Sequence, residues 1–137
     1  MESTCDAAVI AAVRNAWNAG AHDWNSDRLA DVYSPDALFF GGRPGHAVGR
    51  VAIRNYFASY CRIIRSSSVR FEELELRRLA PQTLLAQGFA AFDFVLSNGH
   101  QTHSRLRASW LLVEREGGWC ILQHHISSSP AQPPLGG

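Results

Sequence analysis

The sequence has no apolar run that approaches the roughly 20 residues a membrane-spanning helix needs, and neither sign of charge is in excess. Its 137 residues hold 13 Lys and Arg against 12 Asp and Glu, a formal net charge of +1. The lack of a basic stripe argues against a nucleic-acid partner. The N-terminal segment is acidic and lacks the basic region of a secretory signal. We therefore expect a cytoplasmic protein with neither nucleic-acid nor membrane partners.

Cysteine is scarce as well. Cys5, Cys61 and Cys120 are far apart and odd in number, so they indicate neither a disulfide framework nor a thiolate metal site. His100 and His103, at a predicted hairpin tip, offer too few ligands for a metal centre. No nucleotide fingerprint, flavin motif or haem motif is present. We predict a protein without a metal or a cofactor.

What remains has the composition of one globular domain, 46% hydrophobic and 18% charged. We expect this domain over residues 5–128, followed by a proline-rich flexible tail over 129–137. The element order predicts an α+β fold, α-α-β-α-β-β-β-β, with three helices packed on a curved mixed or antiparallel sheet. Apolar spacing predicts helices at 4–20, 25–33 and 50–64, a glycine loop at 41–49, and strands at 36–40, 69–79, 83–96, 102–115 and 119–127.

The turn of the longest hairpin decides which side chains face the core. A tight Asn-Gly turn places Asp93 beside Ser104 and Arg105 beside Phe92. Asp93 then faces the cavity, where apolar surroundings raise a carboxyl pKa and make it a general base. A loop longer by one residue places Asp93 opposite Arg105 and separates an apolar face from a polar face. We prefer the longer loop, because it keeps a guanidinium away from phenylalanines.

The last predicted strand carries two adjacent histidines. Because side chains alternate along a strand, His124 and His125 must face opposite sides of the sheet. An odd-length loop before this strand places His124 opposite Trp110, on the apolar face, and His125 opposite Ser109, on the polar face. An imidazole titrates near pH 6.5 and suits proton transfer. We therefore select His124 as the first catalytic candidate and Asp93 as the second.

The other candidate residues form two groups. A mostly hydrophobic surface with few polar groups is typical of a small-molecule site, and we expect such a ligand pocket around His124. Its predicted lining is Trp17, Tyr33, Phe39, Tyr56, Phe92, Phe94, Trp110 and His46. The polar face is predicted to hold a dimer-interface or surface network of Arg105, Arg107 and His125.

Three stretches carry a resemblance to a known family: Tyr33-Ser34-Pro35-Asp36-Ala37, the segment from Val48 to Phe57, and the segment from Gly118 to Ser127. Together with the element order, they resemble the nuclear transport factor 2-like superfamily. The resemblance covers about residues 5–128 and is greatest for the SnoaL-like and calcium/calmodulin-dependent kinase II association-domain branches. It implies a cone-shaped α+β fold, and the open sheet face of this fold commonly pairs subunits.

The sequence also departs from two members of that superfamily. Ketosteroid isomerases carry a catalytic aspartate shortly after the Asp-Ala of the first strand, whereas residues 38–42 here hold no carboxylate. The kinase association domain lines its pocket with arginines, and the matching positions here are Ala90, Trp110 and Ile126. Neither the isomerase base nor the anion pocket carries over to this chain.

Two functions remain open at this point. One is a small-molecule-binding, isomerase-, cyclase- or lyase-type protein that acts on a hydrophobic cyclic substrate through proton transfer by His124. The alternative is a non-catalytic binding or dimerisation module that resembles the kinase association domain. In either case we expect a small hydrophobic ligand and a homodimer, and the sequence leaves open whether the protein is an enzyme.

Overall fold

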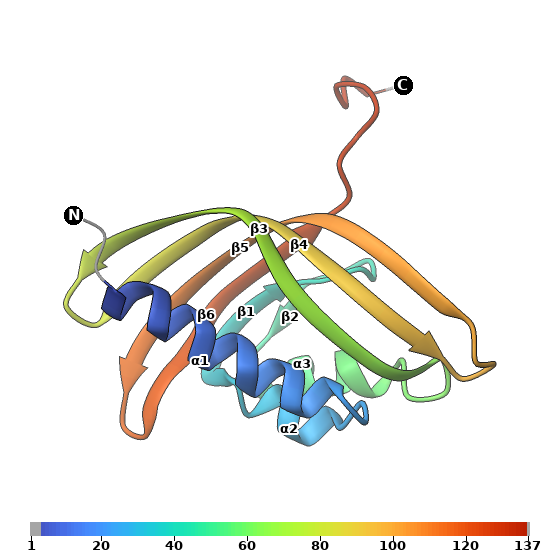
Figure 1. Cartoon of the computed structure of the whole chain (residues 1–137), viewed down its shortest axis with the longest axis horizontal. Helices are drawn as coiled ribbons and strands as arrows, with labels where there is room; N and C mark the ends of the chain where they lie inside the picture. Colours follow the sequence, from blue (N-terminus) through green and yellow to red (C-terminus); the bar gives the residue numbers. More distant parts are fainter. Residues whose placement is uncertain (1–3, 137) are drawn as a thin grey trace.

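The computed structural model describes residues 4–136, so residues 1–3 and Gly137 at the end of the expected tail lie outside the described part. Three helices lie on the concave side of one strongly curved sheet (Figure 1). The helices are α1 (Thr4–Ala21), α2 (Ser26–Ala30) and α3 (Arg50–Ala58). The strands are β1 (Tyr33–Phe40), β2 (Ala47–Val48), β3 (Ile64–Ala80), β4 (Thr83–Leu96), β5 (Gln101–Arg115) and β6 (Gly118–Ser127).

The strands form a single mixed sheet in the order β2-β1-β6-β5-β4-β3. The pair β1–β6 is parallel, and every other neighbouring pair is antiparallel. This architecture confirms the predicted α+β cone fold. It also joins the first strand of the chain to the last one, so side chains about 90 residues apart meet at the same place. No helix in residues 4–136 is long and apolar enough to cross a membrane.

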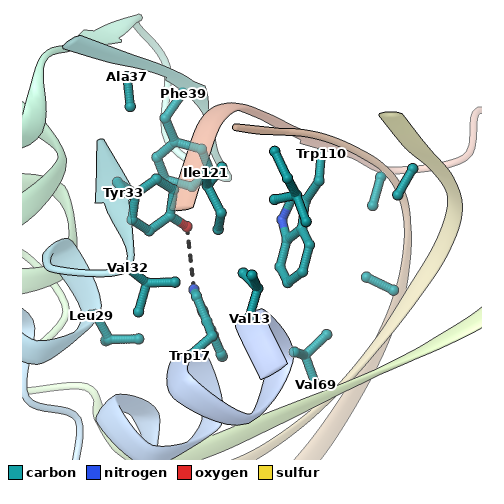
Figure 2. Close-up of a cluster of buried hydrophobic side chains, with 14 of the residues drawn as sticks. Val13, Trp17, Leu29, Val32, Tyr33, Ala37, Phe39, Val69, Trp110 and Ile121 are labelled. Atoms are coloured by element: carbon teal, nitrogen blue, oxygen red, sulfur yellow. Dashed lines mark hydrogen bonds between the residues drawn. The ribbon is translucent and has the colours of Figure 1, made fainter. Parts of the chain in front are cut away.

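The core lies between α1 and the concave face of the sheet (Figure 2). The apolar stripe of α1, including Val13 and Trp17, packs toward Val69 and Trp110 from the sheet and Leu29 from α2. Burial of this stripe is what drives an amphipathic helix onto a sheet.

Several predicted boundaries are wrong. The helix expected over 25–33 is a five-residue helix capped by Asn25, whose side chain accepts a hydrogen bond from the Arg28 backbone N–H, and Tyr33 already begins β1. The helix expected over 50–64 ends at Ala58, and β3 starts at Ile64. The serine run 66–68 therefore belongs to a strand. The glycine loop contains the short strand β2, which pairs Leu38 with Val48.

The β4–β5 hairpin confirms the predicted faces but not the predicted partners. The loop of the hairpin has three residues, 97–99, and is closed by the Leu96 N–H, which donates to the His100 carbonyl. Asp93 lies opposite His103, and Arg105 lies opposite Ala91. The preferred Asp93–Arg105 pairing is therefore wrong, although Asp93 and Arg105 share the outer, convex face as expected.

Two of the register shifts in the sheet change which way side chains point. At Leu122 the β5–β6 register shifts, so that Leu112 pairs with Ile121 while Trp110 pairs with His124. The extra residue lets Ile121 and His124 both point into the core, which strict alternation would forbid. In β3 a bulge at 72–75 places Glu73 at a φ of 53° opposite Gly88. Such bulges bend a strand and increase its twist.

Candidate functional site

His124 sits on β6, in the middle of the concave face. Its imidazole is 3% exposed. The Trp110 ring meets it edge-on at 5.7 Å between centroids, and the Phe39 ring stacks on it at 4.7 Å. The predicted pairings of His124 with Trp110 and of His125 with Ser109 are confirmed. The two histidines therefore lie on opposite faces of the sheet, as the alternation of a strand requires.

A chain of hydrogen bonds orients the imidazole. The indole N–H of Trp17 donates to the phenol oxygen of Tyr33 at 3.2 Å, drawn as the dashed line in Figure 2. The Tyr33 oxygen lies 2.8 Å from Nδ1 of His124. Because the indole can only donate, the Tyr33 oxygen accepts that bond and its own hydrogen is available to Nδ1. A neutral His124 then carries its proton on Nε2.

Burial controls the ionisation of this group. Desolvation, with a smaller contribution from His125, lowers the pKa of His124 from 6.5 to about 3. Desolvation also raises the pKa of Tyr33 far above its usual value of 10, and the bond from Trp17 offsets only part of that shift. Both groups are therefore neutral at physiological pH, and His124 presents a hydrogen-bond donor rather than a charge.

A cavity of about 130 Å³ opens beside His124. Aromatic side chains line most of it. The helices and the segments that follow them contribute Trp17, Trp24, Tyr56, Phe57 and Tyr60, and the strands contribute Phe39, Phe92 and Phe94. Leu106 and Ile126 close the side toward β5 and β6. Residues 4–136 contain no hydrogen-bond partner for Nε2 of His124, so this N–H remains available to whatever fills the cavity.

The structure brings together most of the predicted pocket residues. Trp17, Phe39, Tyr56, Phe92 and Phe94 line the cavity with His124. Tyr33 and Trp110 are not in the lining but contact the imidazole itself. His46 lies elsewhere: it stacks on Phe40 at 4.4 Å, on the opposite side of β1 from Phe39. The glycine loop thus does not place His46 over His124.

Asp93 is not part of this site. It is exposed on the outer face and accepts hydrogen bonds from Arg70 at 3.0 Å and His103 at 2.6 Å. These partners, His103 most of all, hold the pKa of the Asp93 carboxyl below its usual value. The alternative in which Asp93 faces the cavity as a base with a raised pKa is wrong, because the hairpin register turns it outward.

The outer face also carries the predicted basic group. Arg105 forms ion pairs with Glu72 at 2.7 Å and Glu73 at 2.8 Å, and its guanidinium lies over the Phe89 ring. Arg107 and His125 line a separate shallow groove on the same face. The glutamates of the β3 bulge, which the sequence analysis did not assign to this network, hold Arg105 in place.

Sequence reasoning missed Phe57 and Tyr60 as cavity residues. The signal was present, because Phe57 and Tyr60 stand three positions apart in the predicted helix and Tyr56 and Tyr60 stand four apart, spacings that bring side chains together. Trp24 also lines the cavity, and its N–H donates to the Phe57 carbonyl at 2.9 Å. Residues 4–136 contain no cluster of three or more His, Cys, Asp or Glu residues that could hold a metal ion.

Comparison with solved structures places this architecture among known folds. A candidate calcium/calmodulin-dependent protein kinase II association domain from Xanthomonas campestris is 25% identical, over 90% of this chain and 87% of that one, with a TM-score of 0.81. A nuclear transport factor 2-like superfamily protein from Salmonella enterica serovar Typhimurium is 18% identical, over 98% and 99%, with a TM-score of 0.76. A candidate scytalone dehydratase from Novosphingobium aromaticivorans is 11% identical, over 92% and 85%, with a TM-score of 0.75.

No curated protein matches the chain. A family model does match, over residues 10–132, which include every strand of the sheet and the cavity around His124; its description is SnoaL-like domain. The fold, the element order and this match agree with the resemblance seen in the sequence. The chain belongs to the SnoaL-like domain family and has the fold of nuclear transport factor 2-like proteins.

Proposed function

We propose that this protein binds a small, single-ring hydrophobic molecule in the aromatic cavity and anchors one oxygen atom of it through the Nε2–H of His124. The observation that carries the proposal is a buried imidazole, oriented by Tyr33, that has an unused donor facing a cavity lined by aromatic rings. Apolar cavities with a few placed polar groups are the usual form of small-molecule sites.

The size of the cavity limits the ligand. A cavity of about 150 Å³ lined by apolar side chains is known to hold benzene, and this one measures about 130 Å³. Drug-sized ligands need roughly 300 Å³ or more. The cavity therefore fits one six-membered ring, and any further part of the ligand must extend through the mouth.

The role of His124 follows from its ionisation. With a pKa lowered to about 3, the imidazole is a weak base and strongly resists becoming a cation. Proton transfer from Tyr33 to Nδ1 is also unfavourable, because burial disfavours the tyrosinate. Net proton transfer, which the sequence suggested, is thus a poorer fit than hydrogen-bond donation. If the ligand carries a carbonyl group, the same N–H donates to its oxygen and polarises the carbonyl, as donors do in isomerase- and lyase-type sites.

The test compares two probes of nearly equal size, 4-methylphenol and toluene, by NMR titration of the tryptophan indole N–H signals. We expect shifts at Trp17 and Trp24, which line the cavity, and none at Trp119, which does not. We expect 4-methylphenol to bind about fivefold more tightly than toluene, because one net hydrogen bond contributes about 1 kcal/mol.

The matched variants are His124→Leu and His125→Leu, which remove the same side chain from opposite faces of one strand. We expect His124→Leu to abolish the preference for 4-methylphenol and His125→Leu to keep it. Equal affinities for the two probes in the wild type, or the absence of shifts at Trp17 and Trp24, would refute the proposal.

A second function, assembly into a homodimer, is supported by a separate observation. Three apolar side chains from the β1–β2 edge are exposed on the outer side: Leu38 at 40%, Phe40 at 45% and Val48 at 60%. We propose that a second copy of the chain covers this patch. Exposed apolar patches of this kind often mark interfaces.

The oligomeric state tests this second proposal. We expect size-exclusion chromatography with light scattering to give a dimer at micromolar concentration, and Phe40→Asp to give a monomer. Leu79→Asp is the control, because Leu79 is 59% exposed at the far end of β3. A wild-type monomer would overturn the dimer and leave the ligand proposal untouched.

A further inference from the structure

A groove of about 790 Å³ lies at the mouth of the cavity, between the glycine loop and the end of β6. It shares three lining residues with the cavity: Gly42, Leu106 and Ile126. Cavity and groove therefore adjoin at these three residues. A ligand whose ring occupies the cavity can extend its remaining atoms past these residues into the groove.

The lining of the groove carries charge of one sign. Arg43, His46 and His125 are among its lining residues, and no acidic residue is. Phe40 supports both imidazoles, stacking on His46 at 4.4 Å and contacting His125 at 5.3 Å. An anion that enters the groove thus meets a cation and two further groups that can donate hydrogen bonds.

Arg43 is held in place without a counter-charge. Its Nε donates to the Ser59 hydroxyl at 2.8 Å, and its Nη2 donates to the Ser59 carbonyl at 3.1 Å. Its guanidinium carbon lies 4.2 Å from the centroid of the Tyr60 ring. None of the ion pairs among residues 4–136 includes Arg43. Nη1 makes no hydrogen bond within that part of the chain. This contrasts with Arg105, which two glutamates neutralise.

We propose that the mouth groove binds a carboxylate and that Arg43 is its counter-ion, so that the ligand class is small cyclic acids whose carboxylate is joined to the ring by a short chain. This inference rests on the proposed function, because the ring must occupy the cavity next to His124. The groove selects the charged end of the molecule and the cavity selects its ring. The backbone N–H of Gly42, bonded to the Tyr56 hydroxyl at 2.8 Å, fixes the loop that carries Arg43 at the junction of the two.

The experiment uses two probes that differ only in charge, 3-(4-hydroxyphenyl)propionate and the corresponding amide, with the wild-type protein. We expect the acid to bind about fivefold more tightly than the amide at low salt, since an exposed charge pair contributes modestly. Added salt should weaken binding of the acid and leave the amide unchanged.

Two variants locate the effect. Arg43→Gln should remove the preference for the acid while it keeps the affinity for the amide. Arg28→Gln, which removes the same charge from an exposed position on α2, should change neither. Circular dichroism of each variant checks that the fold is retained.

The outcomes separate this inference from the proposed function. If acid and amide bind equally and both depend on His124, the ring site stands and the carboxylate site is refuted. If Arg28→Gln reduces the preference as much as Arg43→Gln does, the effect is long-range charge and the groove site is again refuted. If neither probe binds, both proposals fail.

Discussion

Lowering the pH from 7 to 5 should destabilise this protein through His124, and the size of the effect follows from its burial. In the unfolded chain the imidazole takes up a proton near pH 6.5, whereas in the fold its pKa is lowered to about 3. Between these values the unfolded state binds more protons than the folded state. The stability contributed by the neutral imidazole is therefore complete above pH 6.5 and is lost as the pH falls toward 3.

The slope in that window is about 1.4 kcal/mol per pH unit. Between pH 7 and pH 5 the loss is about 2 kcal/mol, since only the part below pH 6.5 counts. Solvent screening does not reduce this loss of stability, because His124 is only 3% exposed. The lowered pKa values of Asp36 and Asp93 act in the acid range below their usual value of 3.8, outside this window.

The assay is urea denaturation of the wild type and of His124→Gln at pH 7, 6 and 5. Glutamine keeps a polar side chain at position 124 but does not titrate. The stability difference between the two proteins should shrink by about 2 kcal/mol from pH 7 to pH 5, while other titrating groups cancel in the comparison. A difference that stays constant, or an NMR titration in which His124 protonates near pH 6.5 in the folded protein, would refute the reasoning.

Two further predictions concern the framework of the site. Tyr33→Phe removes the oxygen that links Trp17 to His124 and should lower the free energy of unfolding by about 2 to 4 kcal/mol, because two buried groups lose their partner. In urea denaturation, the control Tyr60→Phe at the half-exposed mouth should change stability little. Equal losses of stability in the two variants would contradict the role of the link. Gly88→Ala should lower the free energy of unfolding by about 1 to 3 kcal/mol, because a Cβ there would lie 2.8 Å from the Glu73 carbonyl oxygen. The control Gln87→Ala, at the exposed neighbouring position, should leave the free energy of unfolding nearly unchanged. An unchanged stability of Gly88→Ala would contradict the expected clash with the bulge.

Much of the fold could be predicted from the sequence, because the patterns that indicate helices and strands are local. The 3.6-residue period before residue 60 and the alternation after residue 69 identified the helical and strand regions. The boundaries failed where local and tertiary preferences compete. Ile64 and the serine run 66–68 lie in a strand because they pair with β4. Tyr33 lies in a strand rather than in the predicted helix because it pairs with β6.

The opposite placement of His124 and His125 was determined by the sequence alone, since adjacent residues in a strand cannot face the same side. The separation of an apolar face from a basic face on β5 followed from the same alternation.

The surroundings of His124 were decided only by the tertiary structure. Parallel pairing of β1 with β6 brings Tyr33 to the imidazole across 91 positions of the chain, and α1 supplies Trp17. A three-residue loop turned Asp93 outward, and a one-residue bulge let Ile121 and His124 share the core. Alternation is a property of the backbone and is visible in the sequence, whereas loop length, bulge position and strand partner depend on how distant segments pack together.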